Sequence, residues 1–173
     1  GDFLGYYSER FPVVEVNSTY YRIPHPRVLE LMEKKTPDGF RFIVKLHQSM
    51  THQNSLDPGT IRAFLEVLEP LKRAGKYDGL LAQFPWGFQR TPDNRKHLKG
   101  LREQLPGEPL WVEFRHESWV TPGLEESLRL HRLGYCAVGG AVLGFGLYRM
   151  RQMEDRTWRF WGGFGVPAAM VWV

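Results

Sequence analysis

Polar side chains recur where four apolar runs of this 173-residue sequence end. The runs close with Glu15-Val16-Asn17, Lys45-Leu46-His47, Gln83-Phe84-Pro85 and Glu113-Phe114-Arg115. A glutamate with a raised pKa can move protons. A desolvated lysine can act as a base or form a Schiff base, and arginine binds carboxylate or phosphate in a bidentate fork. These residue types predict acid–base chemistry on a small polar or phosphorylated, sugar-like metabolite.

Ten residues are predicted to carry out this chemistry, and they fall into two groups. The catalytic group is Glu113, Lys45 and His52, with Glu113 as the acid–base residue. The substrate-binding group is Glu15, Asn17, Tyr20, Gln83, Arg115, His116 and Trp119. Within it, the arginine would bind an anion together with Lys45, the two amides would orient the substrate, and the tyrosine and tryptophan would form an apolar wall.

The same charges also have a structural interpretation, which the sequence leaves open. Charged residues inside a barrel often form an ion-pair network, and Glu113 could pair with Arg115 or Lys45 in this way. Side chains alternate along a strand, so Glu113 and Arg115 share a face, as do Glu15 and Asn17. These shared faces fit an active site and a structural network equally well.

Metal and thiol chemistry have weaker support. His47, His52 and His116 could meet around zinc or manganese together with Glu113. No tight spacing such as His-Glu-x-x-His supports this, so no metal ligands are predicted, and the sequence identifies no cofactor. Cys136 is the only cysteine and lies in an apolar run, which predicts a buried strand thiol rather than a nucleophile.

Five short apolar runs are predicted to be strands: residues 13–17, 41–46, 79–84, 110–114 and 135–138. They are four to six residues long, as strands buried on both faces tend to be. Amphipathic stretches separate them. Such alternation of strands and helices forces the strands to be parallel, with right-handed crossovers.

Capping residues followed by proline mark the predicted helix starts. Asp57-Pro58, Thr91-Pro92 and Thr121-Pro122 each begin a helix, and Pro70 is expected to kink or shorten the first of them. Residues 3–11 are expected to form the tail of an earlier helix. A shorter helix from Pro26 is expected to bury Val28, Leu31 and Met32.

The predicted fold class is α/β, a TIM-type (β/α) barrel that is incomplete at both ends. No Gly-x-Gly-x-x-Gly follows any strand, which disfavours an open nucleotide-binding sheet. A full barrel needs about 250 residues, whereas this chain contains about five units. Residues 1–173 are expected to form one domain. Its last part, residues 139–173, is glycine- and tryptophan-rich and lacks the strand–helix rhythm.

Charge and hydropathy leave two further functions open. The net charge is +4, with basic residues scattered as on a solvated surface. Aromatic residues interleaved with arginine between Arg149 and Trp161 favour nucleic-acid binding or processing as an alternative. The third interpretation is a non-catalytic protein that acts through protein contacts, with oligomers expected if the barrel stays incomplete. The sequence predicts no membrane span or signal peptide, so a cytoplasmic location is expected.

Five motifs in the same order resemble the YecE-like family, catalogued as domain of unknown function number 72. They are residues 14–24, 36–45, 51–52, 81–88 and 112–119. The resemblance covers about residues 3–138. It implies a TIM-type barrel and marks the ten candidate residues above as the family's site, but it implies no reaction. The chain departs from the family pattern at its start and after residue 138, where Gly139 stands in place of an aspartate.

Overall fold

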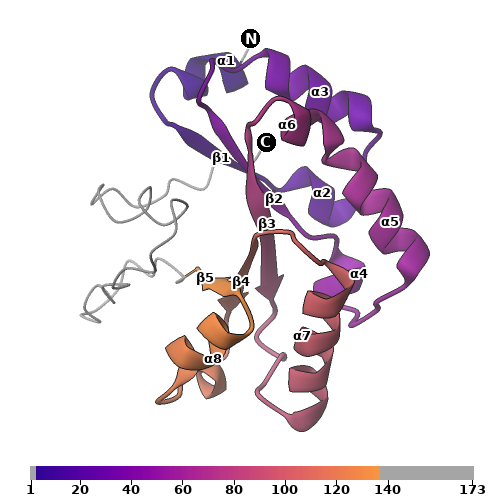
Figure 1. Ribbon diagram of the computed structural model, residues 1–173, viewed down its shortest axis with the longest axis vertical. Helices are drawn as coiled ribbons and strands as arrows, with labels where there is room; N and C mark the ends of the chain where they lie inside the picture. The colour runs from indigo at the N-terminus through magenta and orange to yellow at the C-terminus, as the bar shows by residue number, and fades with distance from the viewer. Residues whose placement is uncertain (1–2, 137–173) are drawn as a thin grey trace.

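Five parallel strands form one sheet in the computed structural model, which describes residues 3–136 (Figure 1). Each neighbouring pair of strands is parallel. The strands follow one another across the sheet in chain order: β1 (Val13–Val16), β2 (Arg41–Lys45), β3 (Tyr77–Phe84), β4 (Leu110–Phe114) and β5 (Leu133–Tyr135). The α/β class with parallel strands is confirmed, whereas closure into a barrel stays a prediction.

Four strands differ in extent from the sequence prediction: β1 and β2 each end one residue early, and β3 and β5 each begin two residues early. β3 begins at Tyr77, two residues early, and passes through Gly79 at a φ of 135°. A Cβ at this position would lie 2.8 Å from the carbonyl oxygen of Pro109, so only glycine lets the strand continue. β5 ends at Tyr135, and residues 137–138 of the predicted strand lie outside the described residues.

Six of the helices lie within segments that the sequence predicts to be helical. They are α1 (Phe3–Ser8), α3 (Pro26–Lys34), α5 (Pro58–Val67), α6 (Glu69–Arg73), α7 (Pro92–Gln104) and α8 (Leu124–Leu130). The side chains of Asp57 and Thr91 cap α5 and α7, as predicted. The sequence predicts that Pro70 kinks or shortens this helix, and the structure shows a break at Leu68, which separates α5 from α6. No helix among residues 3–136 is long and apolar enough to cross a membrane.

The predicted start of α8 is wrong by a few residues. The sequence predicts a helix that begins at Thr121-Pro122, but α8 begins at Leu124. Gly123 has a φ of 90°, which lies in the left-handed region and cannot continue into a right-handed helix. The glycine therefore sets the first residue of α8.

The predicted buried face of α3 is also wrong. Val28 and Leu31 are exposed, whereas Leu29 is fully buried. The helix lies against α5 and α6. Met32 is half-buried against the same core, because residues three apart share one side of a helix. The face that packs is therefore that of Leu29 and Met32.

Alternation along the strands gives the sheet two different faces. One face carries residues such as Val16, Val44 and Ala82, which pack with α3, α5, α6 and α7 into a continuous core. Figure 1 shows these four helices on one side of the sheet. The other face carries a small apolar cluster of Ile43, Leu81 and Trp111. The polar residues of the strands belong to this second face.

Three short helices that the sequence prediction omits follow the ends of strands. They are α2 (Ser18–Tyr21) after β1, α4 (Gln48–Thr51) after β2 and η1 (Glu117–Trp119) after β4. His47 and His116 cap α4 and η1 by accepting hydrogen bonds from backbone N–H groups two residues later. These turns hold the segments that carry the remaining predicted site residues.

Candidate functional site

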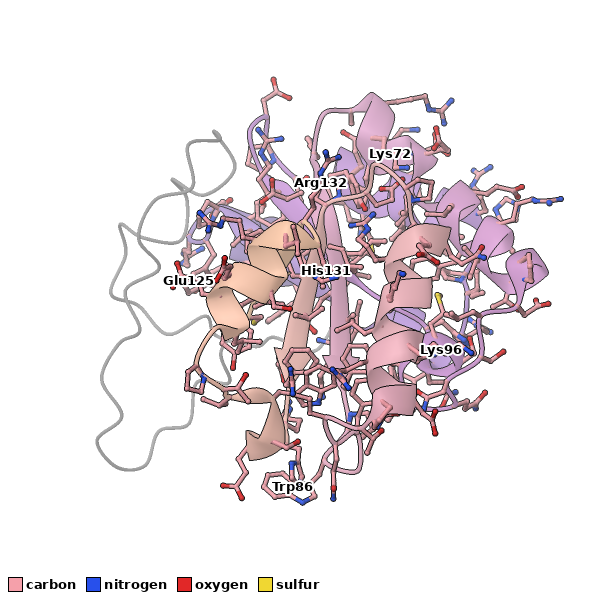
Figure 2. All side chains as sticks on the ribbon, turned by 60° about the horizontal axis from the view of Figure 1, so that its bottom comes forward. Lys72, Trp86, Lys96, Glu125, His131 and Arg132 are labelled. Atoms are coloured by element: carbon pink, nitrogen blue, oxygen red, sulfur yellow. The ribbon has the colours of Figure 1, made fainter. Side chains whose placement is uncertain are left out.

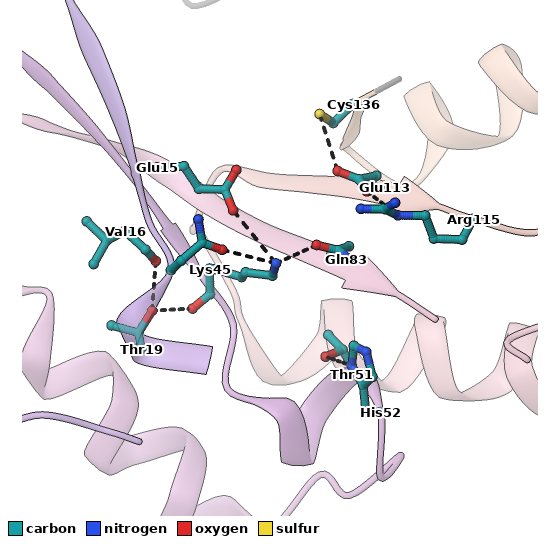
Figure 3. Close-up of polar contacts among 11 residues, drawn as sticks. Glu15, Val16, Thr19, Lys45, Thr51, His52, Gln83, Glu113, Arg115 and Cys136 are labelled. Atoms are coloured by element: carbon teal, nitrogen blue, oxygen red, sulfur yellow. Dashed lines mark hydrogen bonds and ion pairs between the residues drawn. The ribbon is translucent and has the colours of Figure 1, made fainter. Parts of the chain in front are cut away.

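Six of the ten predicted residues meet at the C-terminal ends of β1 to β4, and we call them the strand-end cluster. It consists of Glu15, Asn17, Lys45, Gln83, Glu113 and Arg115. On β2, β3 and β4 a cluster residue follows two positions after Ile43, Leu81 and Trp111. The polar cluster therefore continues the apolar cluster along the same face of the sheet. Figure 3 shows how its side chains converge.

Lys45 lies at the centre of the cluster. Its ammonium donates to Asn17 Oδ1 over 3.1 Å and also to Gln83 Oε1. Glu15 Oε1 lies 3.8 Å from the same nitrogen. The side chain is almost fully buried. Three neighbouring residues thus place oxygen atoms around one desolvated cation, and two of them are neutral amides.

The pKa values of this ion pair are shifted toward each other. Burial raises the pKa of Glu15, Lys45 opposes that rise, and the nearby Glu113 carboxylate adds to it. Burial lowers the pKa of Lys45, against the pull of Glu15 and Glu113. Both groups therefore favour their neutral forms more than they would in water. An acid and a base whose pKa values are shifted in this way are typical of functional sites.

Glu113 and Arg115 form a second ion pair on β4 and just beyond it. Arg115 Nε lies 2.6 Å from Glu113 Oε1. The Glu113 side chain is fully buried, whereas 36% of the Arg115 side chain is exposed. The structural pairing considered from the sequence is thus present for Glu113 and Arg115, while the ion-pair partner of Lys45 is Glu15. The exposed guanidinium keeps further N–H groups for a ligand.

Cys136 reaches this pair from the residue after β5, and the sequence prediction omits it from the site. Its thiol donates to Glu113 Oε2 over 3.9 Å. Burial and the Glu113 carboxylate raise the pKa of the thiol to about 12. Its backbone N–H donates to the Val112 carbonyl, which fixes it beside β4. This contact depends on the register between β4 and β5, which the sequence alone does not give. Alternation from Gly134 does place Cys136 on the correct face of the sheet.

Tyr20 and His52 lie beside Lys45 from the turns after β1 and β2. The Tyr20 ring centroid lies 5.4 Å from Lys45 Nζ and 4.9 Å from the His52 ring. Burial lowers the pKa of His52, and the charge of Lys45 adds to this effect. His52 Nδ1 lies 3.0 Å from Thr51 Oγ1, and Figure 3 shows this pair apart from the bonded network. The two rings therefore border the cluster without bonding to it.

His116 and Trp119 make their contacts outside the cluster. His116 packs against Trp86, with ring centroids 4.9 Å apart. Trp119 is buried and stacks on Phe114 with centroids 4.2 Å apart, and its Nε1–H donates to the Phe88 carbonyl. Phe114 belongs to the helix-side core. Trp119 is therefore part of that core, and the structure does not bring it to the cluster as an apolar wall.

Sequence comparison places the chain among known relatives. Residues 1–160 match the family described as protein of unknown function DUF72. The chain belongs to this family. It is 36% identical over 126 residues to the UPF0759 protein YunF of Bacillus subtilis, a match that covers 69% of this chain and 45% of YunF. It is 34% identical over 124 residues to the UPF0759 protein YecE of Escherichia coli K12, which covers 69% of this chain and 44% of YecE.

Solved structures of DUF72 family proteins share the fold. One from Enterococcus faecalis V583 superposes with a TM-score of 0.71 at 26% identity, over 77% of this chain and 57% of that one. One from Thermotoga maritima MSB8 gives a TM-score of 0.67 at 36% identity, over 78% of this chain and 54% of that one. The chain thus spans about half the length of the relatives it matches.

The strand-end cluster of this DUF72 chain consists of charged side chains and side-chain amides. No group of three or more histidine, cysteine, aspartate or glutamate side chains in the described part of the chain is arranged to hold a metal ion. The surface hollows at α8 and between α1 and the loop before β2 do not border the cluster.

Proposed function

We propose that this chain forms part of a TIM-type barrel enzyme that acts by acid–base chemistry on a small anionic, sugar-like metabolite. The order of the strands supports the barrel. A doubly wound open sheet reverses its strand order at a switch point, whereas here β1 to β5 follow chain order without reversal. The polar residues also gather at the C-terminal strand ends, where barrel enzymes place their sites.

The ion pair of Glu15 and Lys45 carries the catalytic part of the proposal. Their side chains are 3.8 Å apart, and their pKa values are shifted toward each other. A substrate bound against both groups can lose a proton to the carboxylate and gain one from the ammonium. Glu113, the acid–base residue predicted from the sequence, is fully buried against Arg115. Its burial favours a role in orienting that arginine.

Arg115 suits the binding of an anionic group on the substrate. Its guanidinium is partly exposed and is held by its ion pair with the buried Glu113 carboxylate. A guanidinium in a fixed orientation binds a phosphate or carboxylate with two parallel hydrogen bonds. Asn17 and Gln83 accept hydrogen bonds from Lys45 through their amide oxygens, and the amide N–H groups of Gln83 can orient substrate hydroxyls.

Calorimetric titration of the full chain with inorganic phosphate and with sugar phosphates tests the binding step. Arg115→Gln should weaken binding at least about tenfold, because a charge-assisted hydrogen bond is lost. Arg10→Gln is the matched control, since Arg10 is an exposed arginine paired with Glu9 before β1. Binding that is equal in both variants would contradict the proposal.

Turnover separates Glu15 from the binding residues. Phosphorus NMR of a mixture of sugar phosphates should show conversion by the parent chain and a loss of at least about a hundredfold in Glu15→Gln, with affinity retained. Conversion that is unaffected by Glu15→Gln would assign the proton transfer to another group.

Nucleic-acid binding remains the alternative, and its supporting residues, between Arg149 and Trp161, lie outside the described residues. Short single-stranded oligonucleotides in the same titration distinguish the two functions. Affinity that falls steeply with salt and does not depend on Arg115 would favour this alternative over the metabolite.

A further inference from the structure

Trp86 is a large exposed aromatic residue that the proposed roles leave unused. It follows β3 by two residues, and 65% of its surface is exposed. Its ring lies against that of His116 after β4, with centroids 4.9 Å apart and an interplanar angle of 55°. Figure 2 shows Trp86 at the outer edge of the molecule, beyond the ends of the strands. It therefore lies at the same end of the sheet as the cluster.

The segment that carries Trp86 is held on both sides. Phe88 stacks on Phe84 of β3 with ring centroids 4.1 Å apart, and its carbonyl accepts a 2.7 Å hydrogen bond from Trp119 Nε1. The Arg90 N–H donates to Ser118 Oγ over 2.9 Å. These contacts join the segment after β3 to the turn after β4. The exposure of Trp86 is thus a fixed feature of the surface.

His116 presents a hydrogen-bond donor beside this indole. The backbone N–H of Ser118 donates to His116 Nδ1 over 3.1 Å, so Nδ1 must be the acceptor. The proton of the neutral ring is therefore on Nε2. No hydrogen bond from another described residue reaches Nε2. An apolar ring face and an N–H donor are thus adjacent, one residue beyond Arg115.

We propose that Trp86 and His116 bind the ring of a cyclic sugar phosphate whose phosphate is held by Arg115. This inference rests on the proposed function and specifies its substrate class. The C–H face of a sugar ring packs on the indole, and a ring hydroxyl accepts the Nε2–H of His116. The phosphate site and the indole lie at the same end of the sheet, because Arg115 and His116 are consecutive residues after β4. An open-chain sugar phosphate offers the same charge without the flat C–H face.

Titration of the full chain with matched cyclic and open-chain ligands tests this inference. The probes are glucose 6-phosphate with sorbitol 6-phosphate, and ribose 5-phosphate with ribitol 5-phosphate. At least one cyclic ligand should bind about tenfold more tightly than its open-chain partner, and Trp86→Ala should remove this preference. Trp86→Phe should retain part of it. Tyr6→Ala, at a similarly exposed aromatic residue on α1, should change neither affinity.

The outcomes separate this inference from the function on which it rests. If cyclic and open-chain phosphates bind equally in the parent chain, and both depend on Arg115, the sugar-ring inference is overturned while the proposed function stands. If no sugar phosphate binds in an Arg115-dependent way, both are overturned. Replacement of Trp86 should leave the melting temperature unchanged, because its side chain is mostly exposed.

Discussion

Two buried lysines lie at opposite ends of the sheet and have different surroundings. Lys76, just before β3, donates to the carbonyls of Glu33 and Thr36, and its nitrogen lies 2.9 Å from Glu33 Oε1 and 3.3 Å from Thr36 Oγ1. Lys45, at the end of β2, contacts two side-chain amides and a carboxylate at 3.8 Å. Both ammonium groups are almost fully buried.

From this difference we infer that Lys76 is a structural cation, whereas the proposed function makes Lys45 a reactive one. The oxygens around Lys76 include backbone carbonyls at the end of α3, which cannot turn away, and a close carboxylate. The oxygens around Lys45 belong to side chains that can rotate, and its carboxylate partner has a raised pKa. Such a lysine can give up its proton or exchange its partners when a ligand arrives.

The largest expected effect is on stability and comes from Lys76→Met. The change leaves buried carbonyls and the Glu33 carboxylate without their donor, so the free energy of unfolding should fall by about 3 kcal/mol. Urea unfolding measures this fall. Lys99→Met is the control, since this lysine is 68% exposed and 3.9 Å from Glu103, and it should cost less than about 0.5 kcal/mol.

Lys45→Met should be milder for stability and severe for ligand binding. The change removes a desolvated charge, and Glu15 can take up a proton once its partner is lost, so the expected loss is about 1 kcal/mol. Phosphate affinity and turnover should disappear. A loss of stability as large as that of Lys76→Met would make both lysines structural and would end the contrast between them.

The smallest effect is a pH dependence that belongs to Glu15 alone. Its pKa in the folded chain is raised above the ordinary value of 4.5, so the folded state holds this proton more tightly than the unfolded state does. The parent chain should therefore lose stability relative to Glu15→Gln as the pH rises above 4.5. Urea unfolding of both chains at several pH values checks the sign. A relative gain over this range would mean that Lys45 lowers the pKa of Glu15.

Much of the fold was predictable because it depends on local patterns. Apolar runs predict the strands, and capping residues before proline predict α5 and α7, since both signals act within a few residues. The face of α3 was not predictable in this way. Val28, Leu29 and Leu31 are all apolar, and only the position of α6 decides which of them is buried.

The candidate site was predictable in its membership more than in its contacts. Alternation places Glu113 and Arg115 on one face, and they do pair. The pairing of Lys45 with Glu15 depends on how β1 and β2 align, which the sequence does not encode locally. The contact of Cys136 with Glu113 depends likewise on β4 and β5.

Gly134 of β5 lies directly against Trp111 of β4 on the cluster face. A Cβ at residue 134 would be 2.5 Å from the indole carbon Cε3, so no other amino acid fits while the indole remains. The two positions therefore cannot vary independently over evolutionary time. A side chain at 134 therefore requires that the Trp111 indole move or be replaced by something smaller. The Trp111 indole thus also limits which substitutions natural selection can accept at residue 134.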